Sequence, residues 1–172
     1  RAALDRAAPG NRSMTRPAIV VLATVLLDQT TKAAALSGLV PGQPVAILPG
    51  LDLTLGFNEG ASFGLLSGPM SGRPLLMAAV TAGLTLVFAV MALRARHPVE
   101  RTGFALIVGG ALGNIIDRLR QGAVTDFLDV FWQDWHWPTF NVADMAITLG
   151  AACLLASSLP QRRRKEPVRD QG

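Results

Sequence analysis

The sequence predicts an all-α membrane protein with four transmembrane helices, both termini in the cytoplasm and a small β-structure on the outer side. Half of the 172 residues are hydrophobic and only 16% are charged, whereas a soluble domain carries about 25% charged residues. Mean hydropathy is +0.37. Four apolar segments stand out along the chain: Pro17–Val40, Pro74–Leu93, Thr102–Ile116 and Val142–Leu159.

The orientation follows from the basic residues. Twelve of the 16 Lys and Arg residues fall in three polar segments, 1–16, 94–101 and 162–169. Cytoplasmic loops concentrate Lys and Arg in this way, and four crossings place all three segments on one side. We therefore expect a disordered basic tail over 1–16, a membrane domain over 17–160 and a basic cytoplasmic tail over 161–172. Because basic residues flank apolar runs and Tyr is absent, a nucleic-acid partner is not expected.

The four segments differ in how clearly they indicate a span of about 20 residues. Pro74–Leu93 is long and free of charge, whereas Thr102–Ile116 is short. Pro17–Val40 is interrupted by Asp28 and Lys32, which also argue against a cleaved signal peptide there.

The two outer segments carry different signals. Residues 41–73 are rich in Gly and Pro, and Val45–Leu48 and Leu51–Phe57 are separated by Pro49-Gly50. This pattern predicts a small β-hairpin or half-barrel at the membrane face, over about 41–68. Residues 117–141 contain all three Trp residues, a type that favours the lipid headgroup region.

Several polar residues interrupt the apolar segments at one level. Measured from the inner basic residues at about 1.5 Å per residue, they lie in the outer half of a roughly 30 Å hydrocarbon core. Placing an ionisable group at the membrane centre costs roughly 2.5–3.5 kcal/mol of insertion free energy. We therefore favour one shared cluster, in which the polar groups contact one another, over several polar groups that are buried separately. A purely structural network that holds the helices together remains an alternative. The spacing places three sets each on one helix face: Asp28 with Lys32; Asn114 with Asp117 and Arg118; and Asn141 with Asp144. Gly109 and Gly113 have the small-residue spacing of close helix packing.

The residues available for chemistry are mainly carboxylates. The chain has no G-x-S-x-G sequence and no H-E-x-x-H metal spacing, and no metal or cofactor is expected. Asp126 in the outer segment and Asp144 at the start of the fourth apolar segment could meet if the chain between them folds back. Two close carboxylates share a proton and can hydrolyse an amide by general acid–base catalysis. By residue type alone, Asp129 and Asp134 are rival candidates.

Five motifs together resemble the signal peptidase II family of bacterial lipoprotein signal peptidases. They occur in family order and cover residues 28–144: DQTTK at 28–32, FNEGASF at 57–63, GGALGNIIDR at 109–118, VTDF at 124–127 and FNVAD at 140–144. Thr125 and Ser62 stand where the family often has Val and Ala.

The resemblance implies a function and a site. The family consists of aspartic endopeptidases that cleave diacylglyceryl-modified prolipoproteins before the lipidated cysteine, at the outer face of the bacterial inner membrane. Its fold has four helices and an extracytoplasmic β-cradle, and cyclic lipopeptides such as globomycin inhibit it. By motif, Asp126 and Asp144 would be the catalytic pair. Substrate-binding or supporting roles would fall to Asp28, Lys32, Asn58, Gly60, Asn114, Asp117, Arg118 and Asn141. From the residues alone, an ion carrier and a non-catalytic membrane scaffold remain alternatives.

Overall fold

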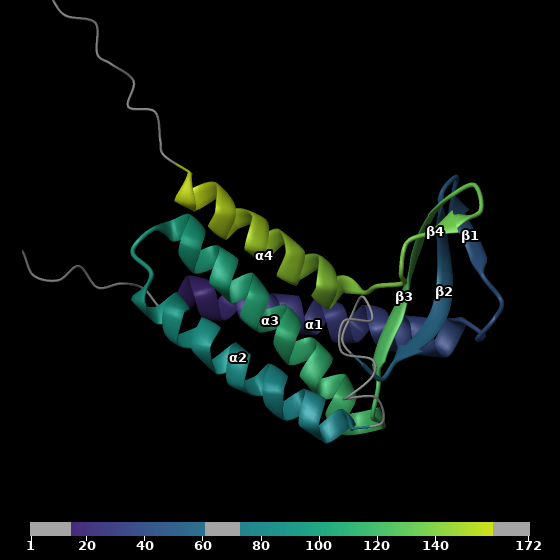
Figure 1. Cartoon of the computed structure of the whole chain (residues 1–172), viewed down its shortest axis with the longest axis horizontal. Helices are drawn as coiled ribbons and strands as arrows, with labels where there is room; N and C mark the ends of the chain where they lie inside the picture. The colour runs from purple at the N-terminus through teal and green to yellow at the C-terminus, as the bar shows by residue number, and fades with distance from the viewer. Residues whose placement is uncertain (1–14, 61–72, 160–172) are drawn as a thin grey trace, which may run out of the picture.

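Four helices form a bundle, and a small antiparallel sheet covers one end of it in this computed structural model (Figure 1). The structure describes residues 15–60 and 73–159. The elements in chain order are α1 Thr15–Gly38, β1 Val45–Leu48, β2 Leu51–Asn58, α2 Pro74–Arg94, α3 Pro98–Gln121, β3 Val124–Trp132, β4 Trp135–His136 and α4 Val142–Ser158. Residues 1–14 of the predicted N-terminal tail, the whole predicted C-terminal tail and residues 61–68 of the predicted outer structure lie outside the described residues.

The helices match the four apolar segments in number and order. Among the described residues, α1, α2 and α3 are long and apolar enough to cross a membrane, whereas α4 is apolar but has 17 residues. The start of α1 and the end of α4 lie at the end of the bundle away from the sheet (Figure 1). The assignment of that end to the cytoplasm stays a prediction.

The third helix is longer than its apolar segment suggested. It has 24 residues and begins with Pro98 in its first turn, where proline's missing N–H leaves no bond unmade. It ends at Gln121, and the residue that caps it, Gly122, has a φ of 81°, a left-handed conformation that favours glycine. Polar residues such as Asp117 therefore belong to the helix, and hydropathy alone underestimated its length.

Helix α3 lies at the centre and contacts the other three helices. Glycines make the close approaches possible. A Cβ at Gly110 would overlap the backbone carbonyl of Ala143 in α4, and one at Gly113 would overlap the carboxylate of Asp28 in α1. A Cβ at Gly109 would lie 2.7 Å from the Thr24 Cβ. The predicted packing role of Gly109 and Gly113 is confirmed.

The sheet has the strand order β1-β2-β3-β4, with every neighbouring pair antiparallel. The predicted hairpin is confirmed: β1 and β2 flank Gly50, whose φ is 84°. Strand β3 follows α3 directly, and its pairing with β2 brings Asp126 opposite Gly56. The hydropathy pattern did not predict β3 and β4 as strands.

Candidate active site

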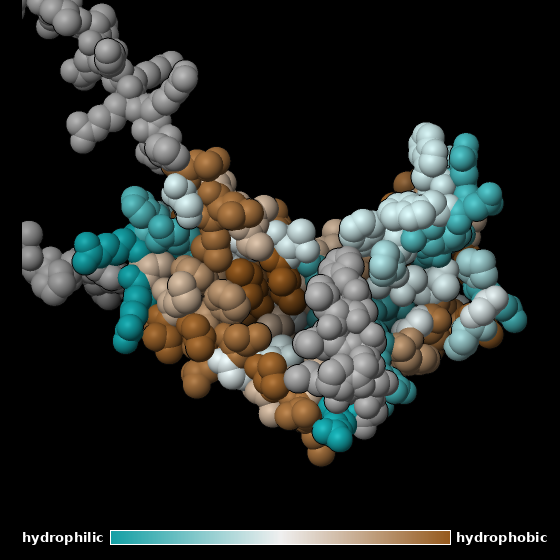
Figure 2. Space-filling view, in the orientation of Figure 1, coloured by the Kyte–Doolittle hydropathy of each residue, from teal (hydrophilic) through white to brown (hydrophobic). Residues whose placement is uncertain are grey.

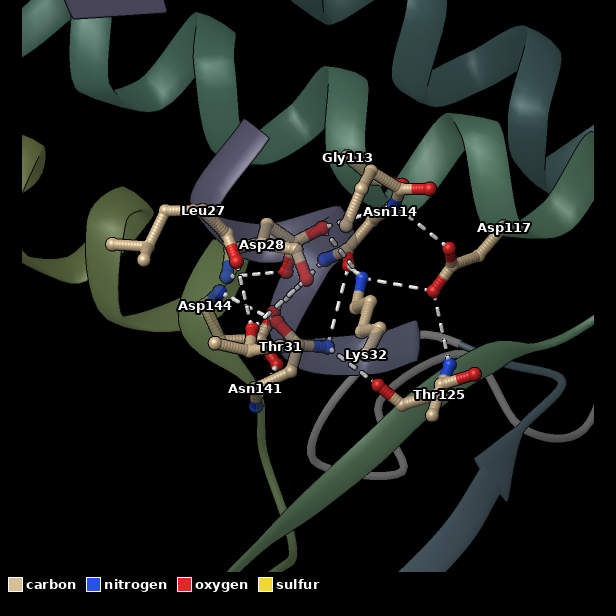
Figure 3. Close-up of polar contacts among 12 residues, drawn as sticks. Leu27, Asp28, Thr31, Lys32, Gly113, Asn114, Asp117, Thr125, Asn141 and Asp144 are labelled. Carbon is tan, nitrogen blue, oxygen red and sulfur yellow. Dashed lines mark hydrogen bonds and ion pairs between the residues drawn. The ribbon is translucent and has the colours of Figure 1, made fainter. Parts of the chain in front are cut away.

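A buried polar cluster lies where α1, α3, β3 and the start of α4 meet (Figure 3). Its residues come from segments more than 100 positions apart in the sequence. Asp28 is fully buried and Lys32 is 2% exposed. Buried charges persist only where they are paired and hydrogen-bonded, so the contacts of this cluster account for its presence in an apolar bundle.

Lys32 is the centre of the cluster. Its Nζ lies 2.9 Å from Asp28 Oδ2 and 2.8 Å from Asp117 Oδ2, and it donates to Asn114 Oδ1 at 2.9 Å. An ammonium has three donors and no acceptor, so these three partners satisfy it completely. The predicted pairing of Asp28 with Lys32 is confirmed and extends to α3.

Lys32 also sets the direction of the Asn114 amide. Because the ammonium can only donate, it holds Asn114 Oδ1 toward itself, and Asn114 Nδ2 points the other way. That nitrogen donates to Asp144 Oδ1 at 3.0 Å. The buried ion pairs of α1 and α3 are thereby connected to the carboxylate at the start of α4.

The start of α4 is held by a capping box. The Asn141 side chain accepts from the Asp144 backbone N–H at 3.0 Å, and the Asn141 N–H donates to Asp144 Oδ2 at 3.4 Å. Asp28 Oδ1 accepts from the Ala143 N–H at 2.9 Å, so α1 supplies a second cap. These contacts satisfy backbone donors that a helix start leaves free and fix the Asp144 side chain at a helix N-terminus, where negative charge is stabilised.

Asn141 brings the two candidate aspartates together. Its Nδ2 donates to Asp126 Oδ1 at 2.6 Å, while its backbone N–H donates to Asp144 Oδ2. Burial and, to a smaller extent, the nearby charge of Asp144 raise the pKa of Asp126 to about 7, against the lowering effect of the Asn58 and Asn141 amides and of Lys32. Asp126 therefore holds a proton near neutral pH beside a second carboxylate.

A groove of about 800 Å³ opens beside these carboxylates. Asn58, Asn114, Arg118 and Asp144 line its polar part, and apolar residues such as Met77 and Ile147 from α2 and α4 line the rest. Arg118 Nη2 donates to the Gly60 carbonyl at 2.9 Å. The buried Arg118 Nε has no partner among the described residues. The arrangement offers two carboxylates that contact the same asparagine, amide and guanidinium donors, and an apolar slot.

Comparison with known proteins shows which family the chain resembles in sequence. The sequence profile described as signal peptidase (SPase) II matches residues 20–160. The chain belongs to the signal peptidase II family. It is 43% identical over 144 residues to the lipoprotein signal peptidase of Hydrogenovibrio crunogenus, covering 83% of this chain and 84% of that one. It is 43% identical over 145 residues to that of Burkholderia mallei, covering 84% of this chain and 87% of that one.

Solved structures agree with the fold. A bacterial membrane enzyme of 25% identity superposes with a TM-score of 0.77, covering 90% of this chain and 94% of that one. A second bacterial membrane enzyme, at 26% identity, gives a TM-score of 0.75 and covers 87% of this chain and 96% of that one. The chain is therefore a member of the signal peptidase II family whose fold is that of these bacterial membrane enzymes.

The structure gathers every predicted site residue at one end of the bundle. Asp28, Lys32, Asn114, Asp117, Asp126, Asn141 and Asp144 form the hydrogen-bonded cluster, while Asn58, Gly60 and Arg118 border it on the groove side. Asn58 Nδ2 donates to Asp126 Oδ2 at 3.3 Å, and Asn58 Oδ1 accepts from the Gly60 N–H.

The rival aspartates lie elsewhere. Asp129 is three residues from Asp126 on the same strand, so its side chain lies on the opposite face of the sheet. There it pairs with His136 at 2.9 Å. Asp134 is exposed in the turn between β3 and β4.

Sequence reasoning gave no role to two residues of the cluster. Gln29 Nε2 donates to Asp28, to Asp117 Oδ1 and to the Gly113 carbonyl. The backbone N–H of Thr125, beside Asp126, donates to Asp117 Oδ2 at 3.1 Å. A polar glutamine inside an apolar segment was the available signal for Gln29, whereas backbone bonds such as that of Thr125 leave none in the sequence.

Proposed function

We propose that this chain is a membrane-embedded aspartic endopeptidase that removes signal peptides from diacylglyceryl-modified prolipoproteins, with Asp126 and Asp144 as its catalytic pair. Cleavage would occur before the lipidated cysteine, at the outer face of a bacterial inner membrane. The observation that carries the proposal is that Asn141 bonds both carboxylates, one of which, Asp144, lines a groove with both polar and apolar residues.

The contacts suggest different roles for the two aspartates. Asp144 accepts from Asn114 Nδ2 and from the Asn141 N–H at a helix N-terminus, so in this proposal it is the proton acceptor. Asp126 has a pKa raised to about 7 and holds the shared proton. In this proposal Asp144 takes a proton from water as that water attacks the scissile carbonyl carbon, and Asp126 gives its proton to the carbonyl oxygen. Collapse of the tetrahedral intermediate breaks the C–N bond as Asp144 gives the proton that it took from water to the amide nitrogen, and Asp126 takes back a proton from a hydroxyl of the intermediate.

The groove matches the two parts of such a substrate. Asn58 and Arg118 offer donors to peptide carbonyls or to the developing oxyanion. The apolar part between α2 and α4 suits a signal-peptide helix or acyl chains. A cyclic lipopeptide such as globomycin would compete for the same groove. In this proposal residues 17–160 form the peptidase domain, and the basic tails 1–16 and 161–172 lie on the cytoplasmic side.

The proposal is tested by removing each carboxylate separately. The expected result is that Asp126→Asn and Asp144→Asn each abolish cleavage of a diacylglyceryl prolipoprotein in detergent while the helical circular dichroism signal is retained. Asp129→Asn is the matched control, because Asp129 lies on the same strand but on the opposite face, and it should keep activity. Full activity in both dyad variants would exclude the aspartate pair.

A further inference from the structure

We propose that Gln29 is a positioning residue for the proposed catalytic pair. Its amide orients the carboxylate of Asp117, and Asp117 holds the backbone of Thr125. That hold fixes the place of Asp126 beside Asp144. The inference rests on the assignment of these two aspartates as the catalytic pair, and it gives Gln29 a role in their geometry rather than in proton transfer.

Thr125 is the residue through which the helices hold the strand of Asp126. It is fully buried, and both of its backbone polar groups bond side chains from outside the sheet. Its N–H donates to Asp117 Oδ2 at 3.1 Å, and its carbonyl accepts from Asn141 Nδ2 at 3.3 Å. Its hydroxyl accepts from Gln121 Nε2 at 2.7 Å. Because the peptide unit is planar, a fixed Thr125 leaves the backbone of Asp126 little freedom.

Asp117 holds Thr125 only while its carboxylate keeps one orientation (Figure 3). Its Oδ2 lies 2.8 Å from Lys32 Nζ and also accepts from the Thr125 N–H. Its Oδ1 accepts from Gln29 Nε2 at 3.0 Å. Rotation of the carboxylate would bring Oδ1 toward Lys32 and take Oδ2 away from Thr125. The bond from Gln29 opposes this rotation, because the rotation would break it.

Gln29 is itself held in place, so it can act as a fixed reference for Asp117. Its Nε2 also lies 3.2 Å from Asp28 Oδ2 and 3.2 Å from the Gly113 carbonyl oxygen. Gly113 lies one turn before Asp117 on α3, so the amide of α1 spans one turn of that helix. Two of the three acceptors are carboxylates, and hydrogen bonds to ionised groups are stronger than bonds between neutral groups.

The surroundings of Gln29 make its bonds hard to replace. Gln29 is partly buried in α1, a helix that is long and apolar enough to cross a membrane. In the view of Figure 2 the surface over the helices is predominantly hydrophobic, as contact with lipid requires. Lipid supplies no hydrogen-bond donor. Without the Gln29 amide, Asp117 Oδ1 would therefore regain a donor by turning toward Lys32.

Two chains of contacts thus reach the two aspartates separately. One reaches Asp144 through the side chain of Asn114. The other reaches Asp126 through Asp117 and the strand backbone. Both carboxylates must act on the same peptide bond, and a misplacement of about 1 Å can cost about 100-fold in rate. Because Gln29 orients Asp117, it sets the position of one aspartate relative to the other.

The first test is the variant Gln29→Met, which keeps the length of the side chain and removes its N–H groups. We expect kcat for cleavage of a diacylglyceryl prolipoprotein to fall roughly tenfold, with KM unchanged because no groove residue is altered. Thr30→Val is the matched control: Thr30 is the next residue of α1, but its hydroxyl bonds the Leu26 carbonyl within the same helix. A normal kcat in Gln29→Met, or equal losses in the two variants, would overturn the proposal.

The amide of Thr125 gives a readout that a general loss of stability would not reproduce. Its hydrogen-exchange rate is measured by NMR spectroscopy on the intact protein in detergent micelles. In Gln29→Met this amide should exchange roughly tenfold faster. The Leu128 amide, which is on the same strand and donates to the Phe140 carbonyl, should keep its rate. Unchanged exchange at Thr125, or equal acceleration at both amides, would overturn the proposal. The measurement needs no cleavage, so it separates a failure of the Gln29 role from a failure of the proposed catalytic pair.

A double-variant cycle tests whether Gln29 acts through Asp117. Asp117→Ala removes the carboxylate that Gln29 orients, so adding Gln29→Met to it should lower kcat little further. Additive losses in kcat would show that Gln29 acts by another route and would overturn the proposal. The exchange measurement uses Gln29→Met alone, so it decides the question even if Asp117→Ala does not fold.

Discussion

Replacing Asn58 by alanine should move the alkaline limit of activity to higher pH. Asp126 must hold a proton to act as the acid, so kcat/KM should fall as pH rises through the pKa of about 7. The Asn58 amide donates to Asp126 Oδ2 and favours the ionised form, which lowers this pKa. Asn58→Ala removes that donor and therefore raises the pKa of Asp126.

The magnitude follows from the bond. The distance between Asn58 Nδ2 and Asp126 Oδ2 is 3.3 Å, longer than the usual N–H···O range, so we assign the bond about 1 kcal/mol. One pKa unit corresponds to about 1.4 kcal/mol, so the limit should shift upward by about 0.7 unit.

The assay is the pH dependence of kcat/KM for cleavage of a diacylglyceryl prolipoprotein between about pH 5 and pH 9, a range that brackets the titration of Asp126. Thr54→Val is the control, because Thr54 is on the same strand but bonds Asp129, whose side chain lies on the sheet face opposite Asp126. It should leave the limit near pH 7. A limit that stays in place or moves to lower pH in Asn58→Ala would refute the assignment of Asp126 as the protonated member.

Three further predictions concern stability, each measured by thermal unfolding in detergent. Lys32→Met leaves the buried carboxylates of Asp28 and Asp117 without their cation and should lower the free energy of unfolding by about 3–5 kcal/mol. Arg120→Met is the control: Arg120 is exposed, so its replacement should change the free energy of unfolding little. Equal effects of the two changes would contradict the buried network. Gly110→Ala should destabilise the folded protein, because the new Cβ would overlap the Ala143 carbonyl. Gly83→Ala is the control: a Cβ there has no neighbour within 4 Å, so the change should leave stability the same or raise it. An unchanged stability in Gly110→Ala would show that α3 and α4 can separate freely. The pKa of Asp126 in the folded state exceeds its ordinary value of 3.8, so the folded state binds this proton more tightly than the unfolded state does. The free energy of unfolding should therefore fall by about 4 kcal/mol as pH rises from about 4 to about 7. Asp126→Asn should remove this part of the dependence of stability on pH, and an unchanged dependence would contradict the raised pKa.

Local sequence patterns predicted much of the fold because the membrane imposes strong local rules. An apolar run of sufficient length in lipid must form a helix, since every backbone group needs an internal partner. The four helices, and the hairpin turn at Pro49-Gly50, follow from such patterns. Hydropathy was least informative for α3, because its outer end carries Asn114, Asp117 and Arg118, whose polarity the cluster compensates.

The sequence by itself determined which residues could do chemistry: charged and amide side chains inside apolar segments, in motifs of a known family, among which Asp126 and Asp144 are the predicted pair. Only the tertiary structure decided how they meet. Lys32 selects the direction of the Asn114 amide, and Asn141 joins the two aspartates. The two faces of the outer sheet likewise depend on the register between β2 and β3. Hydrogen-bond direction and strand register arise from contacts between segments far apart in the chain, so no local pattern of residues encodes them.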